Sequence, residues 1–326
     1  VVCKDMVFKN TIFINIELMN FRSNHTSFIN CTFLGINMLS FSCSDNCVLD
    51  NCTFDNTGRM NGHPVFGLKG WYDSTHDILG GNNNVVSNCR FINLHSSAPS
   101  NRGACGGAIL FAGGNNTVVN STFVNCTLTS PDVTGSSDWI NTDPMLYLRT
   151  GGGAISFAGP GNNVTGCNFT NSWSKATGGA IYFAQGNNTV NDCNFKIDEN
   201  IIDVAKNHTS QTGAIYFDGN DANVISNSTF SDMHGCEALI YSNSPINVTG
   251  SVFKDNNASK IFDLNSTNNY ISDSNFTNNH AVNGGAIYMS DGYVTNCSFV
   301  NNTAETDGGA IYSDGRCIVN DCSFVN

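Results

Sequence analysis

Short apolar stretches separated by Gly and Asn recur along the whole chain. Within a stretch the residues alternate, as in Cys297-Ser298-Phe299, where Cys and Phe share one face of a strand and Ser takes the other. The stretches are too short for helices and rich in β-branched and aromatic residues, whereas Gly and Asn supply the positive φ angles of tight turns. The pattern predicts many short strands, each with one buried face.

Three sequence blocks repeat in a fixed order. The first reads Gly-Gly-Ala-Ile and begins at Gly106, Gly152, Gly178, Gly284 and Gly308, with weaker copies at 212–217, 237–241 and 260–264. The second reads Asn-Asn-x-Val, as in Asn115-Asn116-Thr117-Val118. The third reads (Cys/Ser)-x-Phe-x-(Asn/Asp), and its Phe is Phe33, Phe54, Phe91, Phe123, Phe169, Phe195, Phe230, Phe253, Phe276, Phe299 or Phe324. Phe8 is interpreted as an earlier copy of the third block.

The spacing of the third block indicates the fold. From Phe230 to Phe324 the steps are 23, 23, 23 and 25 residues, which fits three short strands and three turns. One such coil cannot bury its few apolar side chains, but stacked coils share a continuous core. Leucine-rich repeats need a Leu pattern that is not found, and propeller repeats are longer. The sequence therefore predicts an all-β, right-handed, single-stranded parallel β-helix of about 12 coils.

Coil length is not uniform along the chain. The steps from Phe91 to Phe123, Phe123 to Phe169 and Phe195 to Phe230 are 32, 46 and 35 residues. We expect one β-helix domain over residues 1–326, a segment of a longer surface protein, with insertions at 92–105, 127–151 and 196–211 on one corner. Insertions on one face often form a binding surface. The candidate binding residues are Asp138, Trp139, Asp143, Arg149, Asp198 and Glu199.

The composition narrows the class of protein. Hydrophobic residues make up 40% of the chain and charged residues 12%, which does not fit a disordered protein. The net charge of −12, with only 14 Lys and Arg, disfavours nucleic acid as a partner. No apolar run approaches the length of a membrane span. We therefore expect an extracellular or cell-surface location, with the signal peptide and the anchor outside this segment.

The repeat resembles two families of surface proteins. The string from Asn296 to Ala304, followed by Gly-Gly-Ala-Ile-Tyr from Gly308, is similar to adhesin-like surface proteins of methanogenic archaea. The pairing of Gly-Gly-Ala-Ile with a following Phe-x-x-Asn resembles chlamydial polymorphic outer-membrane proteins. The resemblance covers essentially the whole chain and is weakest before Gly81. It implies right-handed coils, secretion and a surface role, and it supplies no catalytic residues.

Half of the 14 Cys share one position, two residues before the Phe. These are Cys31, Cys52, Cys89, Cys167, Cys193, Cys297 and Cys322, and other coils have Ser at the same position. We interpret them as a buried ladder of small side chains. The alternative is disulfides between adjacent coils of a secreted protein. Outside the ladder, Cys43 and Cys47 are the best candidate pair. No metal site is expected, since there is no Cys-x-x-Cys pair.

Asn residues flank the Phe strand on both sides, as Asn88, Asn296 and Asn301 do. We expect their amides to stack along the solenoid and to cap turn backbone groups. The same residues create many glycosylation sequons. The candidate glycosylated residues are Asn24, Asn115, Asn120, Asn163, Asn187, Asn207, Asn247, Asn257, Asn265 and Asn301.

The sequence favours a non-enzymatic adhesin or structural envelope or fibre protein. Its expected partners are surface glycans, other cells or neighbouring copies of itself, which would stack end to end or laterally. The alternative is a polysaccharide-active lyase or glycoside hydrolase that uses the inserted loops. Hydrolysis would need two carboxyl groups separated by about 5 Å or by about 6.5–9.5 Å, and loop residues give no such distance. No phosphate loop, nucleotide fingerprint or catalytic Ser motif is found, and no cofactor is expected.

Overall fold

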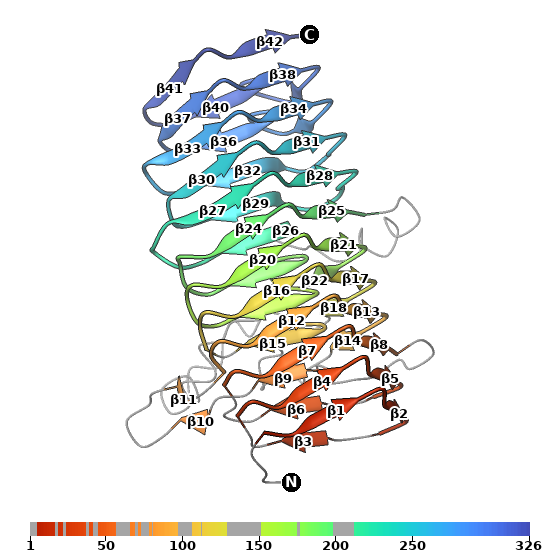
Figure 1. Ribbon diagram of the computed structural model, residues 1–326. Coiled ribbons are helices and arrows are strands. Elements are labelled where there is room, and N and C mark those ends of the chain that lie inside the picture. The colour runs from red at the N-terminus through yellow and green to blue at the C-terminus, as the bar shows by residue number, and fades with distance from the viewer. Residues whose placement is uncertain are drawn as a thin grey trace, which may run out of the picture.

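The computed structural model describes residues 5–16, 19–21, 24–36, 39–41, 45–56, 66–68, 71–72, 78–79, 81–96, 106–111, 113–128, 151–174, 177–197 and 212–326. In these ranges the chain forms strands and turns and no helix. The coils stack into one column with the two termini at opposite ends (Figure 1). Most strands are three residues long, somewhat shorter than the four to five expected from the blocks.

Three long parallel sheets run along the column, and each coil contributes strands to them in turn (Figure 1). Sheet A, formed by the Asn-Asn-x-Val block, has 12 strands: β1 (Val7–Lys9), β4 (Ser27–Ile29), β7 (Val48–Asp50), β12 (Val85–Ser87), β16 (Thr117–Val119), β20 (Asn163–Thr165), β24 (Thr189–Asn191), β27 (Asn223–Ser226), β30 (Ile246–Thr249), β33 (Asn269–Ser272), β37 (Gly292–Thr295) and β41 (Cys317–Asn320).

Sheet B, formed by the Phe block, also has 12 strands: β2 (Ile12–Ile14), β5 (Thr32–Leu34), β8 (Thr53–Asp55), β13 (Arg90–Ile92), β17 (Thr122–Val124), β21 (Asn168–Thr170), β25 (Asn194–Lys196), β28 (Thr229–Ser231), β31 (Val252–Lys254), β34 (Asn275–Thr277), β38 (Ser298–Val300) and β42 (Ser323–Val325). The two 12-stranded sheets confirm the predicted parallel β-helix of about 12 coils.

Sheet C, formed by the Gly-Gly-Ala-Ile block, has 11 strands: β3 (Met19–Phe21), β6 (Leu39–Phe41), β9 (Phe66–Leu68), β15 (Ile109–Phe111), β19 (Ile155–Phe157), β23 (Ile181–Phe183), β26 (Thr212–Phe217), β29 (Ala238–Ser242), β32 (Lys260–Leu264), β36 (Ile287–Met289) and β40 (Ile311–Ser313). Short strands supplement it: β14 (His95–Ser96), β18 (Thr127–Leu128) and β22 (Trp173–Ser174) pair together, as do β35 (His280–Ala281) and β39 (Thr303–Ala304), and β10 (Trp71–Tyr72) pairs antiparallel with β11 (Ile78–Leu79).

The core is a set of columns of identical side chains in register. Phe rings of sheet B stack from Phe13 to Phe324 with neighbouring centroids 4.4–5.0 Å apart. The Ile of the Gly-Gly-Ala-Ile block is buried in the copies from Ile109 to Ile287 and half-buried at Ile311. Phe8 was wrongly interpreted as a copy of the third block: it lies in β1 and stacks on Phe28 of sheet A, and the earlier sheet B copy is Phe13.

The turn from sheet A to sheet B, here called the A–B corner, has the same construction in every coil. Two residues separate the strands, and the first has a positive φ angle: it is Asn, Asp or Gly, from Asn10 to Asp321. The second is Cys or Ser, except for Thr11 in the first coil. Asn and Gly tolerate the left-handed conformation at low cost, so the repeated Asn before the Phe block is required by the backbone.

The buried side chain of the A–B corner ties neighbouring coils together. The Cys52 N–H donates to Cys89 Sγ at 3.4 Å, and the Cys89 N–H donates to Ser121 Oγ at 3.1 Å. In turn, Cys89 Sγ donates to the carbonyl of Ser87 at 3.0 Å. Cys and Ser make the same pair of hydrogen bonds, which explains why they alternate at this position.

A second ladder lies at the turn from sheet C to sheet A, the C–A corner. Asn84, Asn116, Asn162, Asn188 and Asn223 are almost completely buried there. From Asn116 onward, each amide oxygen accepts the backbone N–H and the side-chain N–H of the preceding Asn, as Asn162 Oδ1 does from Asn116 at 3.0 and 3.2 Å, whereas Asn84 Oδ1 accepts the Cys47 N–H. The amides satisfy buried backbone groups that would otherwise destabilise the fold. This buried ladder is not the predicted one, which flanks the Phe strand and lies at the surface, where Asn88, Asn296 and Asn301 donate to side chains of the preceding coil.

Candidate ligand-binding surface

The six predicted binding residues, Asp138, Trp139, Asp143, Arg149, Asp198 and Glu199, lie outside the described residues. The strands on either side of each insertion are described. The segments 92–105, 127–151 and 196–211 each join a strand of sheet B to the next strand of sheet C, and this stretch is here called the B–C connection. A functional surface next to the insertions therefore has to be sought on the outer face of sheet C.

The outer face of sheet C is covered beside the insertions. Leu110, Ser156 and Tyr182 point outward by alternation with the core residues of their strands, yet they are only 7%, 3% and 2% exposed. Gly151, the last residue of the second insertion, lies against them: a Cβ built on it would be 2.1 Å from Ser156 Oγ and 3.1 Å from the Tyr182 ring. The end of that insertion thus packs on this face.

A row of tyrosines continues along the same face in the following coils. The register places Tyr182, Tyr216 and Tyr241 next to one another, then Asp263, and then Tyr288 and Tyr312. Ring centroids are 5.7 Å apart for Tyr182 and Tyr216, 4.4 Å for Tyr216 and Tyr241, and 5.2 Å for Tyr288 and Tyr312. From Tyr216 onward these rings are half-buried. We call the six residues the sheet C row.

Carboxylates and amides hold the tyrosine hydroxyls of the sheet C row. The Tyr182 hydroxyl donates to Asp218 Oδ2 at 2.9 Å, and the Tyr288 hydroxyl donates to Asp314 Oδ2 at 3.2 Å. Burial, followed by the Asp314 charge, raises the pKa of Tyr288, so that its hydroxyl stays protonated and remains a donor at neutral pH. The rings are therefore fixed by their polar ends, which lowers the entropic cost of ligand binding.

Asp263 interrupts the tyrosines with a buried carboxylate. Its side chain is 9% exposed, and its Oδ2 lies 3.0 Å from Lys260 Nζ, which is also 4.0 Å from the Tyr288 ring centroid. The other oxygen, Oδ1, is buried without a hydrogen-bond partner among the described residues. A buried acceptor without a donor costs about 1–3 kcal/mol. This carboxylate consequently gains more than its neighbours from an added donor.

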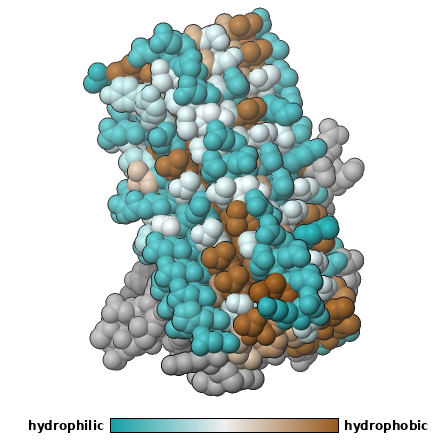
Figure 2. All heavy atoms as spheres, in the orientation of Figure 1, coloured by the Kyte–Doolittle hydropathy of each residue, from teal (hydrophilic) through white to brown (hydrophobic). Residues whose placement is uncertain are grey.

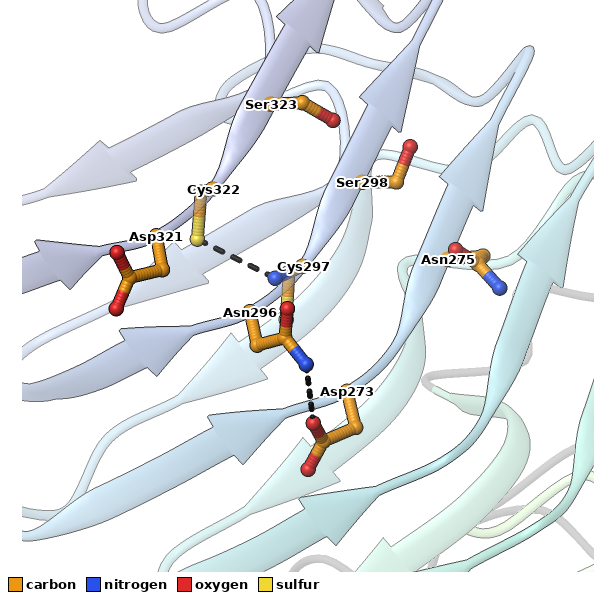
Figure 3. A pocket seen from close by; sticks show the side chains of 8 residues that line it. All are labelled: Asp273, Asn275, Asn296, Cys297, Ser298, Asp321, Cys322 and Ser323. Atoms are coloured by element: carbon orange, nitrogen blue, oxygen red, sulfur yellow. Dashed lines mark hydrogen bonds between the residues drawn. The ribbon is translucent and has the colours of Figure 1, made fainter.

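A separate open hollow lies near the C-terminal end, over the A–B corner. It is lined by Asp273, Asn275, Asn296, Cys297, Ser298, Asp321, Cys322 and Ser323 (Figure 3). The Asn296 amide donates to Asp273 Oδ1 at 2.6 Å, and hydrogen bonds from Asn296 and Ser272 lower the pKa of the Asp273 carboxyl. Asp273 is thus an ionised acceptor and a poor general acid. No aromatic ring lines the hollow, so it offers less contact to a ligand than the sheet C row does.

The Cys of the A–B corner are free thiols, and the predicted buried ladder is confirmed. Cys31, Cys52, Cys89, Cys167, Cys193 and Cys297 are at most 3% exposed, and Cys322 is half-buried. Burial raises the pKa of Cys297 to about 11, which leaves little thiolate at neutral pH. Cys43 lies outside the described residues; Cys47 is buried, with its Sγ 3.8 Å from the Asp45 carbonyl oxygen.

Nine of the ten candidate glycosylation residues are described, and Asn207 lies outside the described ranges. Asn163 is half-buried, and the others are exposed: Asn24, Asn115, Asn120, Asn187, Asn247, Asn257, Asn265 and Asn301. Asn115, Asn120, Asn187 and Asn301 occupy turns with positive φ, whereas Asn163 and Asn247 point outward from sheet A.

Two searches of the described residues concern other kinds of site. No group of three or more His, Cys, Asp or Glu side chains in these ranges has the geometry to hold a metal ion. None of the described segments is a helix long and apolar enough to cross a membrane.

The sequence analysis missed the sheet C row, although its signal was present. Tyr follows Ile in several copies of the Gly-Gly-Ala-Ile block, and one weaker copy has Asp263 at the Tyr position. By strand alternation, the residue after a buried Ile must face outward. Applying that rule to each copy would have predicted the row and its break at Asp263.

Comparisons with known proteins concern the fold. A family described as a right-handed beta helix region matches residues 192–326. No curated protein sequence matches the chain. One similar solved structure is a mannuronic acid specific polysaccharide family 6 lyase from human gut microbiota, with 11% identity and a TM-score of 0.35 over 100% of this chain and 77% of that one.

A second similar structure is a variant of the PL6 family alginate lyase AlyGC, with 11% identity and a TM-score of 0.31. The match covers 97% of this chain, which spans half the length of AlyGC. At these values the likeness carries no conclusion about chemistry. The matched family and the three long parallel sheets agree on the architecture: the chain is a right-handed parallel β-helix.

Proposed function

We propose that this protein is a non-enzymatic, extracellular surface protein whose sheet C row binds glycans. The observation that carries the proposal is the row itself: tyrosine rings in register along one face, half-buried from Tyr216 onward, with the hydroxyls of Tyr182 and Tyr288 held by carboxylates. Aromatic rings offer flat apolar surface, and carboxylates accept hydrogen bonds from hydroxyl groups. Sugar rings combine an apolar face with a rim of hydroxyls and fit both.

The charge of the row favours neutral or amine-bearing glycans over polyuronates. Asp218, Asp263 and Asp314 lie on or beside the row, and Lys260 is already paired with Asp263. The whole chain has a net charge of −12, so an anionic polymer would be repelled. Lys260, which lies between a carboxylate and the Tyr288 ring, exemplifies how this face holds an ammonium group.

The resemblance to adhesin-like surface proteins of methanogenic archaea supports the same proposal. An adhesive role also accommodates binding to other cells or to neighbouring copies of the chain. A polysaccharide lyase or glycoside hydrolase that uses the inserted loops is the alternative, and the experiment below separates the two.

The test is a glycan array followed by calorimetric titration of the best ligand with the intact chain. Tyr241→Ala and Tyr288→Ala should each weaken binding about tenfold, since each removes one ring contact. The matched controls are Tyr270→Ala and Tyr293→Ala, which remove exposed rings from sheet A and should leave the affinity unchanged. Circular dichroism checks that each variant keeps the fold.

Two results would contradict the proposal. If the sheet C variants bind as tightly as the controls, the row is not the binding surface. If incubation with the bound polysaccharide releases unsaturated or reducing sugar products, the chain is an enzyme.

A further inference from the structure

Tyr270 and Tyr293 form a second pair of aromatic side chains, on the outer face of sheet A. Both are 42% exposed, with ring centroids 6.4 Å apart and ring planes 43° from each other. The pair is flanked in the same row of sheet A by Asn247 on one side and by the half-buried Ile318 on the other. These rings therefore leave apolar surface in water with no described side chain over it.

The residue next to this pair is a sequon asparagine. The register places Asn247 beside Tyr270, and Tyr270 beside Tyr293. Adjacent strands are about 4.8 Å apart, so a group attached to the Asn247 amide reaches the Tyr270 ring directly. Asn247 is exposed, and among the described residues its amide has no hydrogen-bond partner.

No other described sequon asparagine on a strand lies beside a tyrosine. Asn163 lies between Thr117 and Thr189, Asn168 between Thr122 and Asn194, and Asn275 between Val252 and Ser298. Sequon residues in turns differ again: Asn301 donates to Asn278 Oδ1 at 3.3 Å, and Asn24 accepts the Asp45 N–H at 3.0 Å. Among these residues Asn247 alone lies beside a tyrosine on an exposed strand position, whereas Asn257, in an isolated bridge, lies between His234 and His280.

We infer that Asn247 carries an N-linked glycan whose first sugar packs its apolar face on Tyr270, with Tyr293 beneath the next sugar. On the same strands, the Ser272 hydroxyl donates to Thr249 Oγ1, and the Thr249 hydroxyl donates to Asp273 Oδ2. The Asn296 amide also donates to Asp273 (Figure 3). This cluster offers acceptors to the sugar hydroxyls. The glycan covers apolar surface that the protein itself leaves exposed.

The modification uses a lipid-linked oligosaccharide as donor. A bond forms between Asn247 Nδ2 and the anomeric carbon of the first sugar, the bond from that carbon to the lipid phosphate oxygen breaks, and the amide loses one proton. This inference does not depend on the sheet C row or its ligand, because it concerns a different sheet.

The test expresses the full chain in a secretory host that installs N-glycans and maps each sequon by peptide mass spectrometry. The expected result is an occupied Asn247. The variant Asn247→Gln, which retains every other glycan, should melt about 2 °C lower. In the Tyr270→Ala background, the same change should lower the melting temperature clearly less, since the ring that the first sugar covers is gone.

The matched control is Asn163→Gln, at a half-buried strand position without a ring, combined with the same Tyr270→Ala change. The change in melting temperature caused by Asn163→Gln should be the same with and without the Tyr270 ring. An unmodified Asn247 alongside occupied exposed sequons would overturn the inference. An occupied Asn247 whose effect on melting is the same with and without the Tyr270 ring would also overturn it, because the glycan would then not pack on the ring.

Discussion

The A–B corner and the B–C connection follow opposite rules within the same coils. Every A–B corner has two residues, a positive φ at the first and, in all but the first coil, Cys or Ser at the second. The B–C connection grows from a few residues to the long segments 92–105, 127–151 and 196–211. The comparison shows which turn holds the register: a corner with buried, hydrogen-bonded side chains cannot change length, whereas a surface connection can.

The largest expected effect on stability comes from inserting one residue into the A–B corner, compared with the same insertion into the B–C connection. One Gly inserted between Ser274 and Asn275 would shift β34 by one residue and turn Phe276 away from the core. We expect the free energy of unfolding to fall by at least about 3–5 kcal/mol, the usual cost of losing a buried Phe. One Gly inserted within 196–211 should cost well under about 0.6 kcal/mol. Urea unfolding followed by circular dichroism measures both; equal midpoints would refute the comparison.

The C–A corner should behave like the A–B corner. Asn162→Ala removes the acceptor of two Asn116 N–H groups, which are buried. Each unpaired group costs about 1–3 kcal/mol. Asn194→Ala, at an exposed strand position where the amide donates to Asn168 Oδ1 at 2.9 Å, should stay within about 0.5 kcal/mol. If thermal melts show equal effects, the buried ladder does not stabilise the fold more than the surface one.

A smaller effect separates hydrogen bonding from packing at the A–B corner. Cys89→Ser should change stability by less than about 0.5 kcal/mol, because Ser already makes the same hydrogen bonds at position 121. Cys89→Ala leaves the Cys52 N–H without its acceptor and should cost about 1–3 kcal/mol. The difference between the two unfolding midpoints is the measurement. A destabilisation by Ser as large as that by Ala would mean that only sulfur packing matters.

The smallest effect concerns reactivity rather than stability. Burial raises the pKa of both Cys126 and Cys236 to about 12, against 9 for an ordinary thiol. The thiolate fraction at pH 8 is then about 1,000-fold lower, and alkylation slows accordingly. We expect both to resist iodoacetamide in the folded chain and to react after unfolding, as read by peptide mass spectrometry. Rapid labelling of the folded chain would show that this part of the core opens.

The repeated residues were sufficient to predict the coils, but not to assign every residue of the irregular first coils to its sheet. Phe at a 23-residue step and paired Gly before Ala and Ile were sufficient to predict the coils, because they recur at matching positions of several coils. Phe8 was misassigned because sheets A and B both place Phe in the core of the first coils, so that residue type alone does not separate them.

The candidate site was harder to predict, for a physical reason. Binding residues were sought in the insertions because loops carry charged and aromatic residues without a core role. The sheet C row instead alternates with core residues inside the most regular block, where Tyr216 or Tyr288 looks like part of the repeat. Aligning the copies of the block places Asp263 where other coils have Tyr, and the register confirms that it interrupts the row.

The constant A–B corner also bears on how such a chain changes length over evolution. A duplication that runs from one A–B corner to the next copies a complete set of three strands and their turns. The Phe of the new coil would enter the existing column of Phe rings. Its Cys or Ser side chain would accept the backbone N–H of the preceding coil's corner residue and donate to the carbonyl two residues earlier in its own coil. Coils are therefore exchangeable units. Whole coils can be gained or lost by in-frame recombination, and the Phe column and the corner hydrogen bonds re-form without any compensating substitution.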